Sequence, residues 1–131
     1  MSESASERME KGFEQLRKML PQNRAEEVRI QWHGISPEFE SLVLGILAGE
    51  VWTRPGLDLR TRSLATIAGL TALGRPRALA LNIKMAVQNG ATRTEIQECI
   101  LQMAFYGGFP CAWEALQIAH EVFQKLDRNP S

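Results

Sequence analysis

The chain has 131 residues, the length of one domain, so a second domain is not expected. Hydrophobic residues make up 44% and charged residues 23%, a balance that excludes an intrinsically disordered chain and predicts a hydrophobic core. The 15 Lys+Arg and 15 Asp+Glu residues cancel, and this lack of net positive charge argues against nucleic acid as a partner.

Cysteine content and hydropathy bear on the compartment. Cys99 and Cys111 are too few for a disulfide framework, which favours a reducing compartment. Residues 1–11 are polar and charged rather than apolar, and no uncharged run approaches the roughly 20 residues of a membrane helix. We therefore expect a cytoplasmic protein with neither an export signal nor a membrane-spanning segment.

The first predicted helix is amphipathic. Its apolar residues recur at helical spacing, at Met9, Phe13, Leu16 and Leu20. Pro21 follows at once, so the helix is expected to end there. Residues 21–35 show no sustained period and are predicted to be a connecting segment, which carries Trp32 and His33.

A second helix is predicted to start at the next two residues. Ser36 is a good N-cap, and Pro37 suits the first helical position. The apolar stripe of this helix consists of Phe39, Leu42, Val43, Ile46 and Leu47. The helix is expected to end near Gly49.

Residues 51–57 contain the adjacent breakers Pro55 and Gly56 and are predicted to form a fixed turn. Asp58 can cap the helix that follows. Residues 63–73 carry no charge on any side, and a helix that is apolar all round must be covered all round. This segment is predicted to be the central helix, and it is covered by protein because it is too short to span a bilayer.

Three further helices complete the predicted fold. One follows Pro76 and ends at Asn89-Gly90, a pair suited to the left-handed turn past a helix end. The next starts at a capping box formed by Thr92 and Glu95. The last starts at Pro110, after two glycines. No strand pattern appears, so the sequence predicts an all-α domain, a compact bundle of about six helices.

The stretch VWTRPGLDLRTRS, residues 51–63, resembles the γ-carboxymuconolactone decarboxylase family of the alkylhydroperoxidase-like superfamily. Further pieces in the family's order are Gln88-Asn89-Gly90, Thr92, Glu95-Ile96, Glu98, Tyr106-Gly107-Gly108-Phe109-Pro110 and Ala115. The most family-like part spans residues 50–123. The resemblance implies one domain over residues 1–131, an all-helical fold, and a trimer or hexamer of identical chains.

The resemblance has two chemical branches. The peroxidase branch uses two cysteines, a histidine and an upstream glutamate, at positions that are here Arg75, Ala78, Asn82 and Ser63, which disfavours a peroxidase. In the decarboxylase branch a histidine and a glutamate stand where Asn82 and Ala78 lie. An amide can donate to a developing enolate oxygen but cannot exchange protons near neutral pH. The acid/base group must therefore come from elsewhere.

Three residues are candidates for catalysis. Asn82 would steady an oxyanion. His33 carries an imidazole, which titrates near neutral pH, in a segment that could fold over a pocket as a lid. Tyr106 precedes two glycines, so its hydroxyl could point into a cavity made by close backbone approach. The alternatives are a solvated surface histidine and a tyrosine that only packs.

Four residues are candidates for substrate binding. Arg54 and Arg62 suit an anionic or carbonyl-rich ligand, or they pair with Asp58 or with another subunit. Trp52 would form a pocket wall or part of the core. Cys111 lies in the first turn of a predicted helix, where backbone N–H groups favour a thiolate, although a buried cysteine is usually inert.

Neither a metal nor a nucleotide is predicted. The histidines and cysteines never fall at metal-ligand spacing, and Gly107-Gly108 lacks the Lys and Ser/Thr of a phosphate-binding loop. The resemblance then implies a cofactor-independent, decarboxylase-like lyase or isomerase acting on a small oxygenated ring compound, such as a lactone or polyketide-like acid. The alternative is a non-catalytic oligomeric binding or scaffold protein of the same fold.

Overall fold

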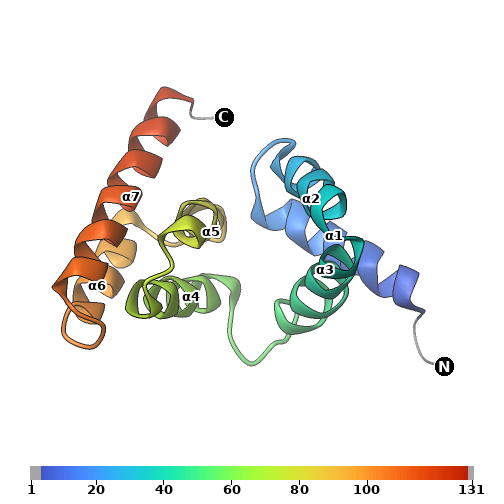
Figure 1. Ribbon diagram of the computed structural model, residues 1–131, viewed down its shortest axis with the longest axis horizontal. Coiled ribbons are helices and arrows are strands. Elements are labelled where there is room, and N and C mark those ends of the chain that lie inside the picture. Colours follow the sequence, from blue (N-terminus) through green and yellow to red (C-terminus); the bar gives the residue numbers. More distant parts are fainter. Residues whose placement is uncertain (1–3, 130–131) are drawn as a thin grey trace. The chain divides into compact units, whose positions relative to one another are not determined.

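A computed structural model describes residues 4–129, and all secondary structure in this range is helical (Figure 1), which confirms the all-α prediction there. The chain divides into two compact units, Met1–Leu57 and Asp58–Ser131. No helix among the described residues is long and apolar enough to cross a membrane. The elements are α1 (Ala5–Met19), α2 (Arg24–Ile35), α3 (Pro37–Leu42), the π-helix η1 (Val43–Val51), α4 (Leu59–Leu73), α5 (Pro76–Gln88), α6 (Arg93–Met103) and α7 (Phe109–Arg128).

The first helix, α1, ends before Pro21 as its sequence predicts, and its start is fixed by a side-chain cap. The Ser4 hydroxyl caps it by accepting a hydrogen bond from the backbone N–H of Glu7, at 3.1 Å. The helix ends before Pro21, and its buried side includes Leu16 and Met19.

The prediction that residues 21–35 form a connecting segment was wrong, because residues 24–35 form helix α2. This helix buries only Ala25 and Val28, so its sequence shows no sustained apolar period. The arginine, alanine and glutamate residues of its first turns are good helix formers, and its acidic first turn suits the helix dipole. His33 therefore lies in the last turn of a helix, not on a loop that closes as a lid.

Helix α3 has the predicted cap, but its continuation η1 turns a different face inward. The Ser36 hydroxyl accepts a hydrogen bond from the backbone N–H of Phe39, at 3.1 Å. Four residues of the predicted apolar stripe are between 47% and 57% exposed: Phe39, Leu42, Ile46 and Leu47. The buried positions are instead Glu40, Leu44, Gly45, Ala48 and Gly49, and the helix continues past Gly49 to residue 51.

Close packing of two backbones explains which face of η1 is buried. Helix α1 crosses η1 at Gly12, where a Cβ atom would overlap the carbonyl oxygen of Leu44. A Cβ atom at Gly49 would lie 3.0 Å from the carbonyl oxygen of Arg8. The two helices can approach this closely only where side chains are absent, so the glycines select the face.

In the second unit, α4 packs against α5, α6 and α7, which makes it the central helix of this unit (Figure 1). The Asp58 carboxylate caps it by accepting from the backbone N–H of Thr61, at 2.7 Å. Gly74 ends it in the left-handed conformation, with φ of 68°. Within the described residues, one side of α4, which includes Ile67, is buried. Leu73, at the end of this helix, is 70% exposed.

The other predicted caps of the second unit are also confirmed. Gly90 follows α5 with φ of 99°, and Thr92 and Glu95 form both hydrogen bonds of the capping box before α6. The turn between α6 and α7 lies against α4, because a Cβ atom at Gly107 would be 2.6 Å from the Cα atom of Ala72. The largest apolar residues of the core are Ile67, Leu79, Ile83, Ile96, Ile100 and Phe123.

Candidate functional site

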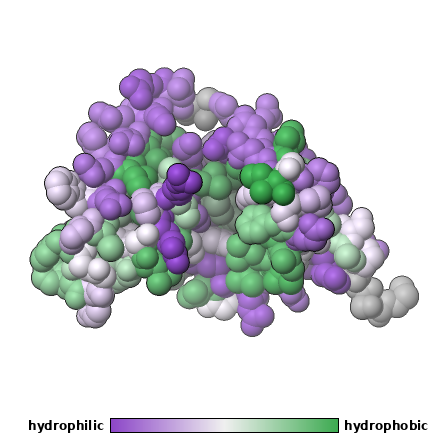
Figure 2. Space-filling view, viewed as in Figure 1, coloured by the Kyte–Doolittle hydropathy of each residue, from purple (hydrophilic) through white to green (hydrophobic). Residues whose placement is uncertain are grey.

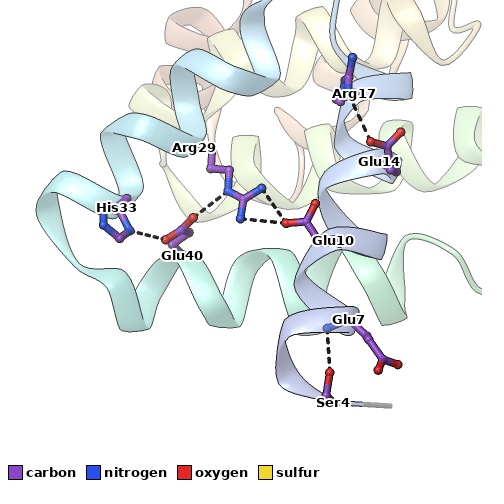
Figure 3. Close-up of polar contacts among 8 residues, drawn as sticks. All are labelled: Ser4, Glu7, Glu10, Glu14, Arg17, Arg29, His33 and Glu40. Carbon is purple, nitrogen blue, oxygen red and sulfur yellow. Dashed lines mark hydrogen bonds and ion pairs between the residues drawn. The ribbon is translucent and has the colours of Figure 1, made fainter.

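A buried carboxylate in the first unit holds the candidate site together. Glu40, on α3, is only 5% exposed. Its Oε2 atom accepts a hydrogen bond from Nε of Arg29, at 2.8 Å, and its Oε1 atom lies 2.7 Å from Nδ1 of His33 (Figure 3). A glutamate at such a depth is rare in proteins unless it is paired, and here two ionisable side chains pair with it.

The local helices position these three side chains. Arg29 and His33 are four residues apart on α2, so they project from the same face of that helix. The chain reverses at Ser36, which ends α2 and caps α3. Glu40 then lies in the first turn of α3 and faces both side chains.

Arg29 is itself held by two further contacts from α1. Its Nη1 and Nη2 atoms both lie 3.4 Å from Oε1 of Glu10. Its guanidinium stands over the ring of Phe13, with the Cζ atom 4.6 Å from the ring centroid. The guanidinium therefore links α1, α2 and α3.

Hydrogen bonds from Arg29 and then from His33 hold the pKa of Glu40 below its usual value, although burial acts in the opposite direction. Glu40 is therefore ionised at neutral pH. The cluster combines a carboxylate that can only accept hydrogen bonds with an imidazole that can exchange protons.

A cavity of about 360 Å³ adjoins the cluster. It is lined by Arg29, Ile30, His33, Gly34 and Glu40. This volume lies at the small end of the range for small-molecule sites. An imidazole on the wall of such a cavity can transfer a proton to or from a small molecule.

The other sequence-predicted residues of the first unit lie after η1. Trp52 is buried, and Arg54 is exposed in the turn that follows. His33, Trp52 and Arg54 thus share the first unit, whereas the remaining four candidates belong to the second.

Asn82, on α5, makes a hydrogen bond inside its own helix. Its Nδ2 atom donates to the carbonyl oxygen of Ala78, at 2.8 Å. The resemblance placed the usual histidine and glutamate of the decarboxylases at these two positions. One of the two amide N–H groups of Asn82 is therefore engaged, and the other stays available as a donor.

The two cysteines lie on different helices and line different cavities. Cys111, on α7, lines a cavity of about 230 Å³ together with Thr71 and Arg75. Cys99, on α6, lines one of about 290 Å³, and burial raises the pKa of its thiol. Neither forms a disulfide within the described residues.

Tyr106 and Arg62 complete the set. Tyr106 is 75% exposed in the turn after α6, so it neither packs in the core of the second unit nor lines one of the three cavities described above. Arg62 is half-buried on α4. Among the described residues, no three His, Cys, Asp or Glu side chains are grouped as metal ligands.

Glu40 and Arg29 were not among the residues predicted from the sequence. One signal in the sequence was the spacing of four residues between Glu40, Leu44 and Ala48. This spacing puts the carboxylate at one end of a helical face that is otherwise apolar and buried. A second signal was the spacing of four residues between Arg29 and His33. The first signal depends on which face of α3 and η1 is buried, and the second depends on α2 being a helix.

Acid should destabilise the first unit through Glu40. Because its pKa in the folded protein is below its usual value of 4.5, its stabilising contribution is complete above that pH and is lost as the pH falls through the folded pKa. We expect Glu40→Gln to lower the free energy of unfolding by about 1–3 kcal/mol at pH 7. The loss should shrink below pH 4.5, measured by urea unfolding. Glu50→Gln, at an exposed site on η1, is the control. A loss in Glu40→Gln that does not change with pH would contradict this prediction.

Comparison with known proteins shows the family to which the chain belongs. Residues 37–121 match the model of the carboxymuconolactone decarboxylase family. The chain is 35% identical, over 95% of its length and 92% of the relative's, to 4-carboxymuconolactone decarboxylase of Acinetobacter baylyi. It is 36% identical to the nitrosuccinic acid decarboxylase npaB of Metarhizium robertsii, over 60% of this chain and 54% of that protein.

A third relative is an uncharacterised 15.0 kDa protein of Paracoccus denitrificans, 38% identical over 71% of each chain. The chain belongs to the carboxymuconolactone decarboxylase family, which confirms the resemblance described from residues 50–123. The names of two relatives support a decarboxylase-like function at the level of the family.

Proposed function

We propose that this protein is a cofactor-independent, decarboxylase-like lyase that acts on a small oxygenated ring compound, such as a lactone or polyketide-like acid. The observation that carries the proposal is the imidazole of His33 beside a cavity, 2.7 Å from a buried carboxylate. Membership of a family with decarboxylases among its relatives gives the reaction class.

The reaction needs one proton at carbon. The bond between the ring carbon and the carboxylate breaks, and its electron pair stays on that carbon, delocalised onto a neighbouring carbonyl oxygen as an enolate. CO2 leaves, and the imidazolium of His33 gives its proton to the carbon. The neutral imidazole then regains a proton from water, so the protein returns to its starting state.

Two further residues keep the roles inferred from the sequence, and each role is proposed and tested by itself. Arg54 would hold an anionic group of the substrate. Asn82 would donate its second amide N–H to an oxyanion, and removal of such a donor typically costs about 10²–10³ in kcat. Separate Arg54→Ala and Asn82→Ala variants test these roles, through KM and kcat respectively.

The direct test is release of CO2 from candidate acids. The purified protein, with no added cofactor, should release CO2 from 4-carboxymuconolactone or from another lactone or ring acid in a panel that includes nitrosuccinate. Activity that persists in EDTA supports cofactor-independent chemistry. If no compound of the panel is bound or decarboxylated, the proposal fails and the scaffold alternative is favoured.

Thiol chemistry should not contribute to this activity. Cys99 and Cys111 lie on different helices and line separate cavities. The double variant Cys99→Ser/Cys111→Ser should therefore keep kcat/KM within about tenfold, or ~1.4 kcal/mol in the barrier. A thousandfold loss in a variant with an unchanged circular dichroism spectrum would instead assign the chemistry to a thiol.

We further propose a homo-oligomer, a trimer or hexamer, in solution. Large apolar side chains are exposed around the α6–α7 turn, which is green and white in Figure 2: Leu73, Leu101, Phe105, Tyr106, Phe109 and Trp113. Stable interfaces bury about 1,600 Å² in total, and such residues supply the apolar part. Light scattering should give a mass of at least three chains, and a stable monomer at micromolar concentration would contradict this prediction.

A further inference from the structure

We infer that Glu40 is a positioning residue: it keeps a proton on Nδ1 of His33, so that Nε2 is the nitrogen that exchanges protons at the cavity. This inference deepens the proposed function and rests on it for its catalytic meaning. The tautomer of His33 itself is a property of the resting protein and can be measured without turnover.

The chemistry of the contact between Glu40 and His33 determines which atom carries the proton. Oε1 of Glu40 and Nδ1 of His33 are 2.7 Å apart, a distance typical of a charge-assisted hydrogen bond. An ionised carboxylate has no proton to donate, so Nδ1 must be the donor. Burial of Glu40 limits the access of water that would compete for this bond.

The carboxylate is also held in a fixed orientation. Oε2 of Glu40 accepts from Nε of Arg29, at 2.8 Å, so both carboxylate oxygens are engaged. Arg29 is held in turn by Glu10 and by the ring of Phe13. Rotation of the carboxylate away from His33 would break the bond to Arg29 as well.

The same contact determines which proton moves. Nδ1 keeps its proton in the neutral imidazole and in the imidazolium, because the same carboxylate accepts from it in both states. The proton gained and lost is therefore the one on Nε2. The His33 side chain is 66% exposed, so water can restore this proton after each turnover.

The charged groups near the imidazole come from all three helices of this cluster. Glu40 contributes from α3, Arg29 from α2 and Glu10 from α1. With Arg29 paired between two carboxylates, the cluster with a neutral imidazole carries one net negative charge. Protonation at Nε2 neutralises this charge, and release of the proton restores it.

The test is NMR spectroscopy of the full chain with 15N-labelled histidine. In the wild-type protein, long-range 15N–1H spectra at a pH where His33 is neutral should show the Nδ1–H tautomer. In Glu40→Gln the new amide can accept from Nδ1–H or donate to Nδ1, so both tautomers become possible. We expect the ratio of Nε2–H to Nδ1–H to rise about tenfold, the loss of one charge-assisted bond.

The matched control is Glu38→Gln, which changes an exposed glutamate on the same helix and should leave the tautomer unchanged. A wild-type protein with mainly the Nε2–H tautomer overturns the inference, and so does an unchanged ratio in a folded Glu40→Gln variant. The wild-type spectrum decides the question even if the variant does not fold.

Activity separates this inference from the proposed function. Glu40→Gln should lower kcat at least about tenfold with little change in KM, since both carboxylate oxygens of Glu40 are engaged by Arg29 and His33 and none is left to bind the substrate. If the tautomer is as inferred but His33→Ala is fully active, the proton role of His33 fails while the positioning of its ring stands. If His33→Ala is inactive but the tautomer is Nε2–H, the positioning inference fails alone.

Discussion

Replacing His33 by alanine should lower kcat by about 10²–10⁴, the usual contribution of a general acid or base, with a smaller change in KM. The reason is that the variant loses the group proposed to protonate carbon and keeps the rest of the cavity wall. The measurement is CO2 release under steady-state conditions, at the pH of maximal wild-type activity.

The chain offers a matched control for this experiment. His120 is its other histidine, and it is exposed on α7. His120→Ala should therefore leave kcat within about threefold, because exposed substitutions away from a site have small effects. A fully active His33→Ala variant would contradict the proposed proton role, and an inactive Tyr106→Phe variant would then assign that role to Tyr106.

A methyl group at Gly12 should unfold or severely destabilise the first unit. The Cβ atom of Gly12→Ala would overlap the carbonyl oxygen of Leu44, which is backbone of η1 and cannot turn aside as a side chain can. We expect a loss of at least about 3 kcal/mol in the free energy of unfolding, measured by urea titration followed by circular dichroism.

Gly34→Ala is the control for the Gly12 variant. Gly34 lies in α2, in the same unit, and a Cβ atom there has no neighbour within 4 Å. In a helix, alanine is favoured over glycine by about 1 kcal/mol, so this variant should be as stable as the wild type or slightly more so. A loss below 1 kcal/mol in Gly12→Ala would show that α1 and η1 can separate at little cost.

Helix ends were predictable because their chemistry is local. The side-chain caps at Ser36, Asp58 and Thr92 and the left-handed glycine Gly74 each act within a few residues of the sequence. Such signals need no knowledge of the rest of the fold. The hydrogen bond of Asn82 is local as well. Asparagine side chains within helices can donate to the backbone carbonyl oxygen four residues earlier, as Asn82 does here.

The buried face of η1 was not predictable from apolar periodicity. Counting apolar residues favours Phe39, Leu42 and Ile46, yet the contact between η1 and α1 is made by backbone atoms at Gly12 and Gly49. Glycine has a low helix propensity, so a sequence pattern gives it little weight. Here the glycines matter because they allow a second helix to pack closely. The choice of face is therefore a tertiary effect.

The candidate site was predictable only in part for the same reason. Sequence reasoning selected His33 from its titration range, but the partner that orients it comes from the next helix. Glu40 became visible once α2 proved to be helical and once the inner face of α3 and η1 was known. The chemistry of one residue can be inferred from its type, whereas the hydrogen bond that directs it needs the fold.

The π-helical geometry of η1 has a consequence for how the chain tolerates deletions. At its end the backbone N–H of Trp52 donates to the carbonyl oxygen of Leu47, at 2.9 Å, five residues earlier instead of four. Each such turn accommodates one residue more than an α-helical turn of equal height. Removing a single residue from 43–51 would let the segment become α-helical and continue α3 with the usual α-helical hydrogen bonds. The segment therefore acts as a spacer whose length can change by one residue without a break in the helix.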